Sequence, residues 1–131
     1  MKNILSLIIL TIILFGCGDY VRTKRGYIIK GNSKIVFNGV DKQLNNKSII
    51  SGFVVSKKTN EFIENAFVKI GTQKIQTDKN GFFITTIEPG IYSVSSNYIG
   101  NNEEKINDLK IDKNNRLIII FELGTSVIQC N

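Results

Sequence analysis

The chain has no histidine and no tryptophan among its 131 residues, and it has only one proline and two cysteines. The absence of histidine removes the commonest general base and the commonest neutral metal ligand. The sequence also lacks a nucleophile elbow, a phosphate-binding glycine loop and a Cys-x-x-Cys motif. These absences predict a protein that is not an enzyme and that holds no metal and no cofactor.

The N-terminus carries one basic residue, Lys2, ahead of an apolar run from residue 4 to residue 15. A run of this length is typical of a secretory signal and is short for a helix that spans a bilayer. It ends in Leu14-Phe15-Gly16-Cys17, which resembles the lipobox of bacterial lipoproteins. The resemblance implies that residues 1–16 are a signal peptide that is removed and that Cys17 carries the acyl chains, palmitate among them. An ordinary signal peptide with an incidental cysteine is the alternative.

The residues around the predicted attachment site indicate the location and the redox chemistry of the chain. Gly18, not aspartate, follows Cys17, and the resemblance to the lipoprotein sorting rule implies the outer membrane. A Cys17 thioether could not form a disulfide with Cys130, the second cysteine. Cys130 is then either a free thiol or a partner for another chain.

Charge is distributed unevenly along the chain. Nine basic residues lie between residues 20 and 58 against one acidic residue, whereas from residue 59 onward seven basic residues accompany nine acidic ones. We expect residues 17–46 to be a basic tether that contains one or two short strands, at 27–29 and 34–37. The tether either lies on anionic lipid headgroups or is a solvated linker. No basic motif is interleaved with aromatic residues, so we expect no nucleic-acid partner.

From residue 48 onward, short apolar runs alternate with turn residues, and no helical periodicity is present. Within 66–71, for example, Ala66, Val68 and Ile70 fall on one face of an extended chain. The runs predict seven strands, at 49–56, 66–71, 74–77, 82–87, 91–99, 105–111 and 116–123. This number of short strands predicts an all-β sandwich of two sheets. The sandwich is expected at 47–124, followed by a C-terminal tail at 125–131.

Three short motifs in this region occur together and in order: Ala66-x-Val68, Thr77-Asp78-x-Asn80-Gly81-x-Phe83 and Gly90-x-Tyr92. With these motifs, residues 48–123 resemble the carboxypeptidase regulatory-like domain. The resemblance implies a seven-stranded Greek-key sandwich of the transthyretin-like and immunoglobulin-like type. It also implies a non-catalytic structural or interaction module, in a family that is abundant in exported proteins of Bacteroidota.

The sequence Asp78-Lys79-Asn80-Gly81 combines a side-chain acceptor with a glycine at a position where φ is expected to be positive. We interpret it, together with Thr77 before it and Gly90 after the next strand, as a structural turn motif. A calcium loop would need a bidentate glutamate, which is absent at the required spacing. The motif is therefore not predicted to bind a metal.

Two other groups of residues are candidate sites. Glu103, Glu104 and Asp108 are close in sequence, but we expect them in a solvated hairpin loop and not facing each other across a cleft. Aromatic residues could form either core or a contact patch, and core is favoured because strands such as 82–87 are apolar on both faces. The aromatic residues concerned are Phe53, Phe67, Phe82, Phe83, Tyr92 and Tyr98.

The sequence thus predicts a lipid-anchored protein of the cell envelope whose sandwich is a non-catalytic structural or binding module. The expected partners are the membrane, through the N-terminal lipid, and an envelope protein or glycan. An accessory lipoprotein of an envelope secretion or transport machine is the alternative function.

Overall fold

The computed structural model describes residues 26–127, so the signal segment, Cys17 and Cys130 lie outside the described residues. The described part of the chain consists of ten strands and one 3₁₀ turn, η2 (Lys42–Leu44). The strands are β1 (Tyr27–Ile29), β2 (Asn32–Val40), β3 (Ser48–Ser56), β4 (Phe67–Ile70), β5 (Gln73–Gln76), β6 (Phe82–Ile87), β7 (Gly90–Asn97), β8 (Glu104–Ile111), β9 (Asn115–Leu123) and β10 (Thr125–Val127).

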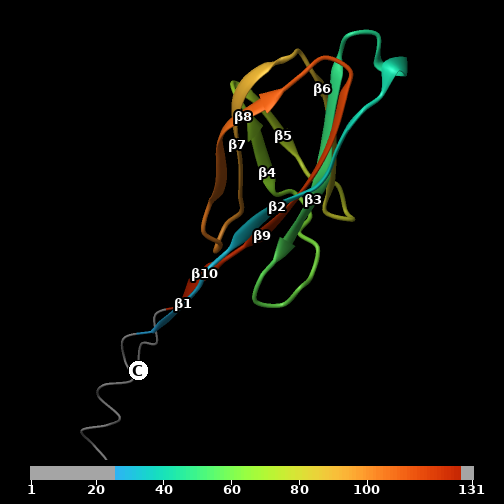
Figure 1. The fold of residues 1–131 in the computed structure, drawn as a ribbon. Coiled ribbons are helices and arrows are strands. Elements are labelled where there is room, and N and C mark those ends of the chain that lie inside the picture. Colours follow the sequence, from blue (N-terminus) through green and yellow to red (C-terminus); the bar gives the residue numbers. More distant parts are fainter. Residues whose placement is uncertain (1–25, 128–131) are drawn as a thin grey trace, which may run out of the picture. The chain divides into compact units, whose positions relative to one another are not determined.

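The strands form two four-stranded sheets and one two-stranded pairing (Figure 1). The β9 sheet has the strand order β2-β9-β3-β6, the β7 sheet has the order β5-β4-β7-β8, and β1 pairs with β10. In the two larger sheets β3 and β9 run parallel and the other pairs are antiparallel. The described residues are all-β, as the sequence predicts, and the seven predicted strands appear as β3 to β9, within two residues at each end.

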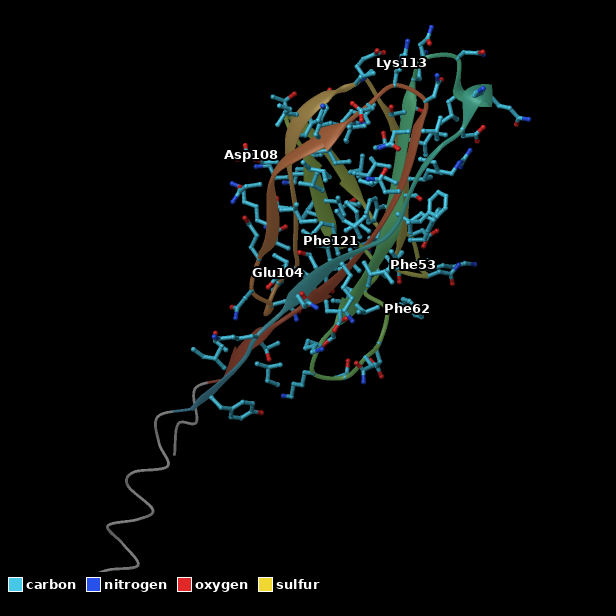
Figure 2. All side chains as sticks on the ribbon, in the orientation of Figure 1. Phe53, Phe62, Glu104, Asp108, Lys113 and Phe121 are labelled. Atoms are coloured by element: carbon cyan, nitrogen blue, oxygen red, sulfur yellow. The ribbon has the colours of Figure 1, made fainter. Side chains whose placement is uncertain are left out.

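The β9 and β7 sheets share one hydrophobic core. Each sheet contributes alternate residues of its strands, the pattern of a strand with one face against a partner sheet. Phe121 lies between the sheets (Figure 2), with its ring centroid 6.3 Å from that of Phe83. The core residues are Ile50, Val54, Ile63, Ala66, Val68, Ile70, Phe83, Ile87, Val94, Leu109, Ile111, Leu117, Ile119, Phe121 and Leu123. The fold is therefore a β-sandwich.

A glycine is required where the central strands of the β9 sheet meet. Gly52 of β3 pairs with Ile119 of β9 on one side and with Phe83 of β6 on the other. A Cβ atom at Gly52 would collide with the carbonyl oxygen of Ile119 and would lie 2.9 Å from the Phe83 ring. The missing side chain thus leaves space for the Phe83 ring in the core.

The strand β2 is longer than the sequence predicts. The sequence predicts a short strand at 34–37 inside a tether, but β2 has nine residues, and all of them except Val36, which lies at a register shift, pair with β9. Polar residues at both ends of β2 have little intrinsic strand preference, so the ladder with β9 extends the strand beyond its apolar centre. The compact unit consequently spans Ile29–Ser126, compared with the expected 47–124.

Strand structure also lies outside the predicted sandwich at the C-terminal side. β10 falls within 125–131, which was expected to be a tail, and it pairs with β1, which matches the short strand expected at 27–29. A run of three residues has too little pattern to be recognised in a sequence without its partner strand.

Candidate functional site

The predicted turn motif forms a tight connection between β5 and β6. The Asp78 Oδ1 atom accepts hydrogen bonds from the backbone N–H groups of Asn80, at 2.8 Å, and Phe82, at 3.0 Å. Gly81 has a φ of +72°, which favours glycine. The carboxylate of Asp78 is thus used by the turn backbone, and in the described residues no group of three or more carboxylate or cysteine side chains could hold a metal ion.

Thr77 has a different role from the turn residues that follow it. Its buried hydroxyl donates to the Ile63 carbonyl oxygen at 2.6 Å and accepts from the Ala66 N–H at 2.9 Å. It therefore connects the start of β4 to the segment before it. Sequence reasoning missed this role because both partners are more than ten positions away along the chain.

Gly90 is the first residue of β7, where a Cβ atom would lie 3.3 Å from the Tyr92 ring. The Tyr92 hydroxyl donates to the Glu88 carbonyl oxygen at 2.7 Å, across the connection between β6 and β7. Gly90 therefore serves this connection by leaving space for the Tyr92 ring.

The acidic residues near β8 do not converge on a site. Glu104 and Asp108 belong to β8 itself, and not to the hairpin loop in which the sequence placed them. They lie at separate points along the strand (Figure 2). Asp108 has a φ of 53° and lies opposite a register irregularity between Tyr92 and Val94 of β7. The positive φ of Asp108 is that of a residue in a local β-bulge. We therefore assign Asp108 a structural role and not a role in a paired-carboxylate site.

The aromatic residues divide between core and surface. Phe83 is buried, and Tyr92 packs against the core. Phe67 lies on the exposed side of the β7 sheet, where the Lys74 ammonium is 4.0 Å from its ring centroid. Phe53 and Phe82 instead lie on the side of the β9 sheet that faces away from the core. The predicted preference for core is therefore wrong for Phe53, Phe67 and Phe82, and also for Tyr98, which is 38% exposed. In β3 and β6 both faces are apolar, so one apolar set remains outside the core.

Register identifies the other residues on that side, since directly paired residues point to the same side of a sheet. Phe53 pairs with Phe82 of β6 and with Ile120 of β9. Ser51 pairs with Ile84 and Ile118 in the same way, and Phe37 of β2 also pairs with Ile118. We call the apolar residues in the two central cross-strand rows of this surface, the rows of Ile118 and Ile120, the apolar face: Phe37, Phe53, Phe82, Ile84, Ile118 and Ile120.

The apolar face is open to solvent in the described structure. Phe37 is 48% exposed and Ile84 is 55% exposed, and the other four residues are partly exposed. At one end the Phe53 ring contacts the Phe82 ring, with centroids 5.3 Å apart, and the Phe62 ring, with centroids 5.5 Å apart. Phe62 belongs to the segment between β3 and β4 and is 60% exposed, and Figure 2 shows it beside Phe53. Contiguous exposed apolar surface of this kind is typical of an interaction site.

Ion pairs occupy the two ends of the apolar face along β9. At one end, the Arg116 guanidinium lies 3.0 Å from the Asp41 carboxylate. At the other end, Glu122 accepts from the ammonium groups of Lys34, at 2.8 Å, and Lys57, at 2.7 Å. The apolar face is therefore bounded by a neutral pair at one end and by a cluster with one net positive charge at the other.

These contacts lower the pKa values of both acids. Hydrogen bonds from Lys34 and then Lys57 hold the pKa of Glu122 below its ordinary value. The pKa of Asp41 is lowered by the backbone N–H of Gln43 and by the Arg116 guanidinium. Both carboxylates are therefore charged at neutral pH.

Two hollows of the described surface contain titratable residues. One hollow of about 290 Å³ has Glu88 and Tyr92 as its titratable residues, and another of about 270 Å³ has Glu61, Glu64 and Tyr98. In neither of these two hollows does a serine, threonine or tyrosine hydroxyl form a hydrogen bond with a carboxylate, so no nucleophile is held by a base there. In the part of the chain that the structure describes, no helix has the length and the apolar character needed to cross a membrane.

Comparison with known proteins does not assign the chain to a family. No protein-family model matches the sequence, and no curated protein matches it. The function therefore has to follow from the chain's own residues and their arrangement.

Proposed function

We propose that the chain is a lipid-anchored protein of the cell envelope whose β-sandwich is a non-catalytic binding module. The anchor is Cys17, the location is the outer membrane, and the binding surface is the apolar face of the β9 sheet. The observation that carries the proposal is the apolar face itself, because no strand of the described residues packs over it. Enclosing one exposed phenylalanine side chain in a partner contributes roughly 1.5–3 kcal/mol, so several such residues favour association.

Within this proposal, the sandwich is a carboxypeptidase regulatory-like domain with transthyretin-like Greek-key topology. The strands β3 to β9 supply its seven strands, and β2 adds an eighth at the free side of β9. Three features support it: the parallel pairing of β3 with β9, the split of the seven strands into β6-β3-β9 and β5-β4-β7-β8, and the tight turn at Asp78–Gly81.

The chemistry of the apolar face favours a protein over a glycan as the partner. Sugars are held by hydrogen-bonding groups placed around aromatic rings, whereas the six side chains of the apolar face carry no hydrogen-bonding atom. The sole polar side chain in the middle of the surface is that of Ser51, which is largely buried. A protein partner that presents apolar side chains matches the apolar face better than a glycan does.

Site-specific photo-crosslinking tests the proposed binding surface. A photoreactive phenylalanine analogue replaces Phe53 in the full-length lipoprotein, and cells are irradiated with their envelope intact. We expect a discrete protein adduct from position 53. The matched control is the same analogue at Ile91, which is exposed on the β7 sheet, and which should give no adduct. Equal adducts from both positions, or none from position 53, would contradict the proposal.

A further inference from the structure

We infer that the partner of the apolar face is a second copy of this chain, packed sheet against sheet around a two-fold axis that runs across the strands. The inference rests on the proposed function, since it names the partner of the same surface. In this arrangement the strands of the two β9 sheets run in opposite directions, and β9 of one copy lies over β9 of the other. Aligned sheets stack about 10 Å apart, and a two-fold contact uses the same surface on both copies.

The charges along β9 are self-complementary in this arrangement. The outward residues of β9 are, in order, Arg116, Ile118, Ile120 and Glu122. A two-fold axis at the middle of this series places Arg116 over Glu122 of the second copy, and the two isoleucines over each other. The alternative is a two-fold axis that runs along the strands, which would place β9 of one copy over β3 of the other. That arrangement gives Arg116 and Glu122 no partner of opposite charge, because β3 carries no charged residue on this surface.

The sizes of the side chains are complementary as well. Phe53 lies in the same cross-strand row as Ile120, whereas Ser51 lies in the row of Ile118. The two-fold axis exchanges these rows, so the ring of Phe53 lies over the small Ser51 of the second copy. A large side chain over a small one is how two packed sheets interdigitate without voids.

The outer strands follow the same exchange of rows. Phe82 of β6 is in the row of Phe53, and Ile84 is in the row of Ser51. Phe82 of one copy therefore lies over Ile84 of the second copy. On the β2 side, Lys34 is in the row of Ile120 and Phe37 is in the row of Ile118. The Lys34 ammonium is thereby placed over the Phe37 ring of the second copy, which is a favourable cation–π geometry.

The ion pairs at the ends fit this arrangement. The end with Glu122 carries two lysines and therefore one net positive charge, and the opposite end carries Asp41 beside Arg116. Across the two-fold axis, the cluster with one net positive charge of one copy meets the neutral Asp41–Arg116 pair of the other copy, so the two ends do not repel each other. Each of these contacts occurs twice in the dimer, which doubles its contribution.

The decisive experiment uses two complementary charge variants of the full-length lipoprotein. Arg116→Glu leaves acidic side chains at both ends of β9, and Glu122→Arg leaves basic side chains at both ends. Each variant repels its own kind at both contacts, but the two variants together form opposite-charge contacts at both ends. Copies with different epitope tags are co-expressed, and dimers are captured by the photoreactive analogue at position 53 in intact envelopes.

For the unaltered chain we expect an adduct that contains both tags. When both tagged copies are Arg116→Glu, or both are Glu122→Arg, this adduct should fall about tenfold, because facing like charges oppose association. When one copy carries each substitution, the yield should return to within about threefold of the unaltered chain. Recovery in the mixed pair also shows that each variant is folded.

Three outcomes would overturn the inference: no two-tag adduct from the unaltered chain, no loss in the single variants, or no recovery in the mixed pair. An adduct at position 53 that contains a different protein and never both tags refutes the second copy while it supports the proposed binding surface. The absence of any adduct at position 53 refutes both.

Discussion

At the scale of single residues, two buried hydroxyl groups of the sandwich are expected to behave in opposite ways. Thr77 is buried and has two hydrogen-bond partners, Ile63 and Ala66. Ser96 is equally buried, but its hydroxyl finds no partner among the described residues. The two positions therefore form a matched pair for a stability measurement.

Thr77→Val should lower the free energy of unfolding by about 2–3 kcal/mol, because it leaves a buried N–H and a buried carbonyl oxygen without partners. Ser96→Ala should change it by less than about 1 kcal/mol, because no hydrogen bond is lost. Urea unfolding monitored by circular dichroism gives both values. A cost for Ser96→Ala as large as that for Thr77→Val would contradict the assigned roles.

The turn between β5 and β6 is expected to depend more on Gly81 than on Asp78. Gly81→Val forces a β-branched side chain into a positive φ and places its Cβ 2.9 Å from the Val54 carbonyl oxygen, so about 3 kcal/mol of stability should be lost. Asp78→Ala removes exposed hydrogen bonds and should cost about 1 kcal/mol.

A calcium titration separates turn chemistry from metal binding at this position. The melting temperature of the unaltered protein should not respond to added calcium or to a chelator. If calcium raised the melting temperature and Asp78→Ala abolished the response, the interpretation as a structural turn would be wrong.

Glu122 is expected to stabilise the sandwich in a pH-dependent way. Its pKa in the folded protein is lowered from the ordinary value of 4.5, so its contribution is present above that value and is lost as the pH falls through the folded pKa. Glu122→Gln should therefore cost about 1 kcal/mol at pH 7 and much less in acid below the folded pKa. Urea unfolding at a series of pH values measures this, with Glu103→Gln at an exposed position as the control. A cost that stays constant down to the lowest pH would contradict the ion-pair assignment.

At the scale of elements, β2 is the part of the fold whose contribution the sequence least reveals. A domain beginning at residue 47 would contain all seven predicted strands, but it would lack β2 and leave β9 as an edge strand with unpaired backbone groups. An exposed edge next to an apolar face also favours aggregation.

A protein that begins at residue 47 should therefore be less stable than one that begins at residue 29, by about 2 kcal/mol, or roughly 8–16 °C in Tm. Both should give a β-type circular dichroism spectrum, and thermal unfolding compares them. Equal melting temperatures would show that β2 is an appendage that the sandwich does not need.

At the scale of the whole molecule, the proposed lipid anchor at Cys17 would decide where the sandwich acts. Cys17→Ser should abolish incorporation of labelled palmitate and release the protein from the membrane fraction, because acyl chains hold a protein to a bilayer through their buried methylene groups. Cys130→Ser is the control and should keep both properties. Labelling that persists in Cys17→Ser would contradict the proposed anchor.

Local features of the fold were determined by the sequence alone. The strands β3 to β9 follow from short alternating apolar runs, and the Asp78–Gly81 turn follows from hydrogen bonds that close within four residues. These depend on neighbours in the chain, and a sequence lists neighbours directly. The anchor at Cys17 is likewise a prediction from adjacent residues, those of the Leu14–Cys17 motif.

The tertiary structure decided which of two apolar faces became core. In β3 and β6, both the inward set and the outward set are largely apolar, as Phe83 beside Phe82 illustrates, and period-two alternation cannot say which set meets the second sheet. The tertiary structure also decided three other features: the parallel pairing of β3 with β9, the pairing of β2 with β9, and the two hydrogen-bond partners of Thr77. Each depends on register between segments that are distant in sequence, and that register is set by packing and not by local preference.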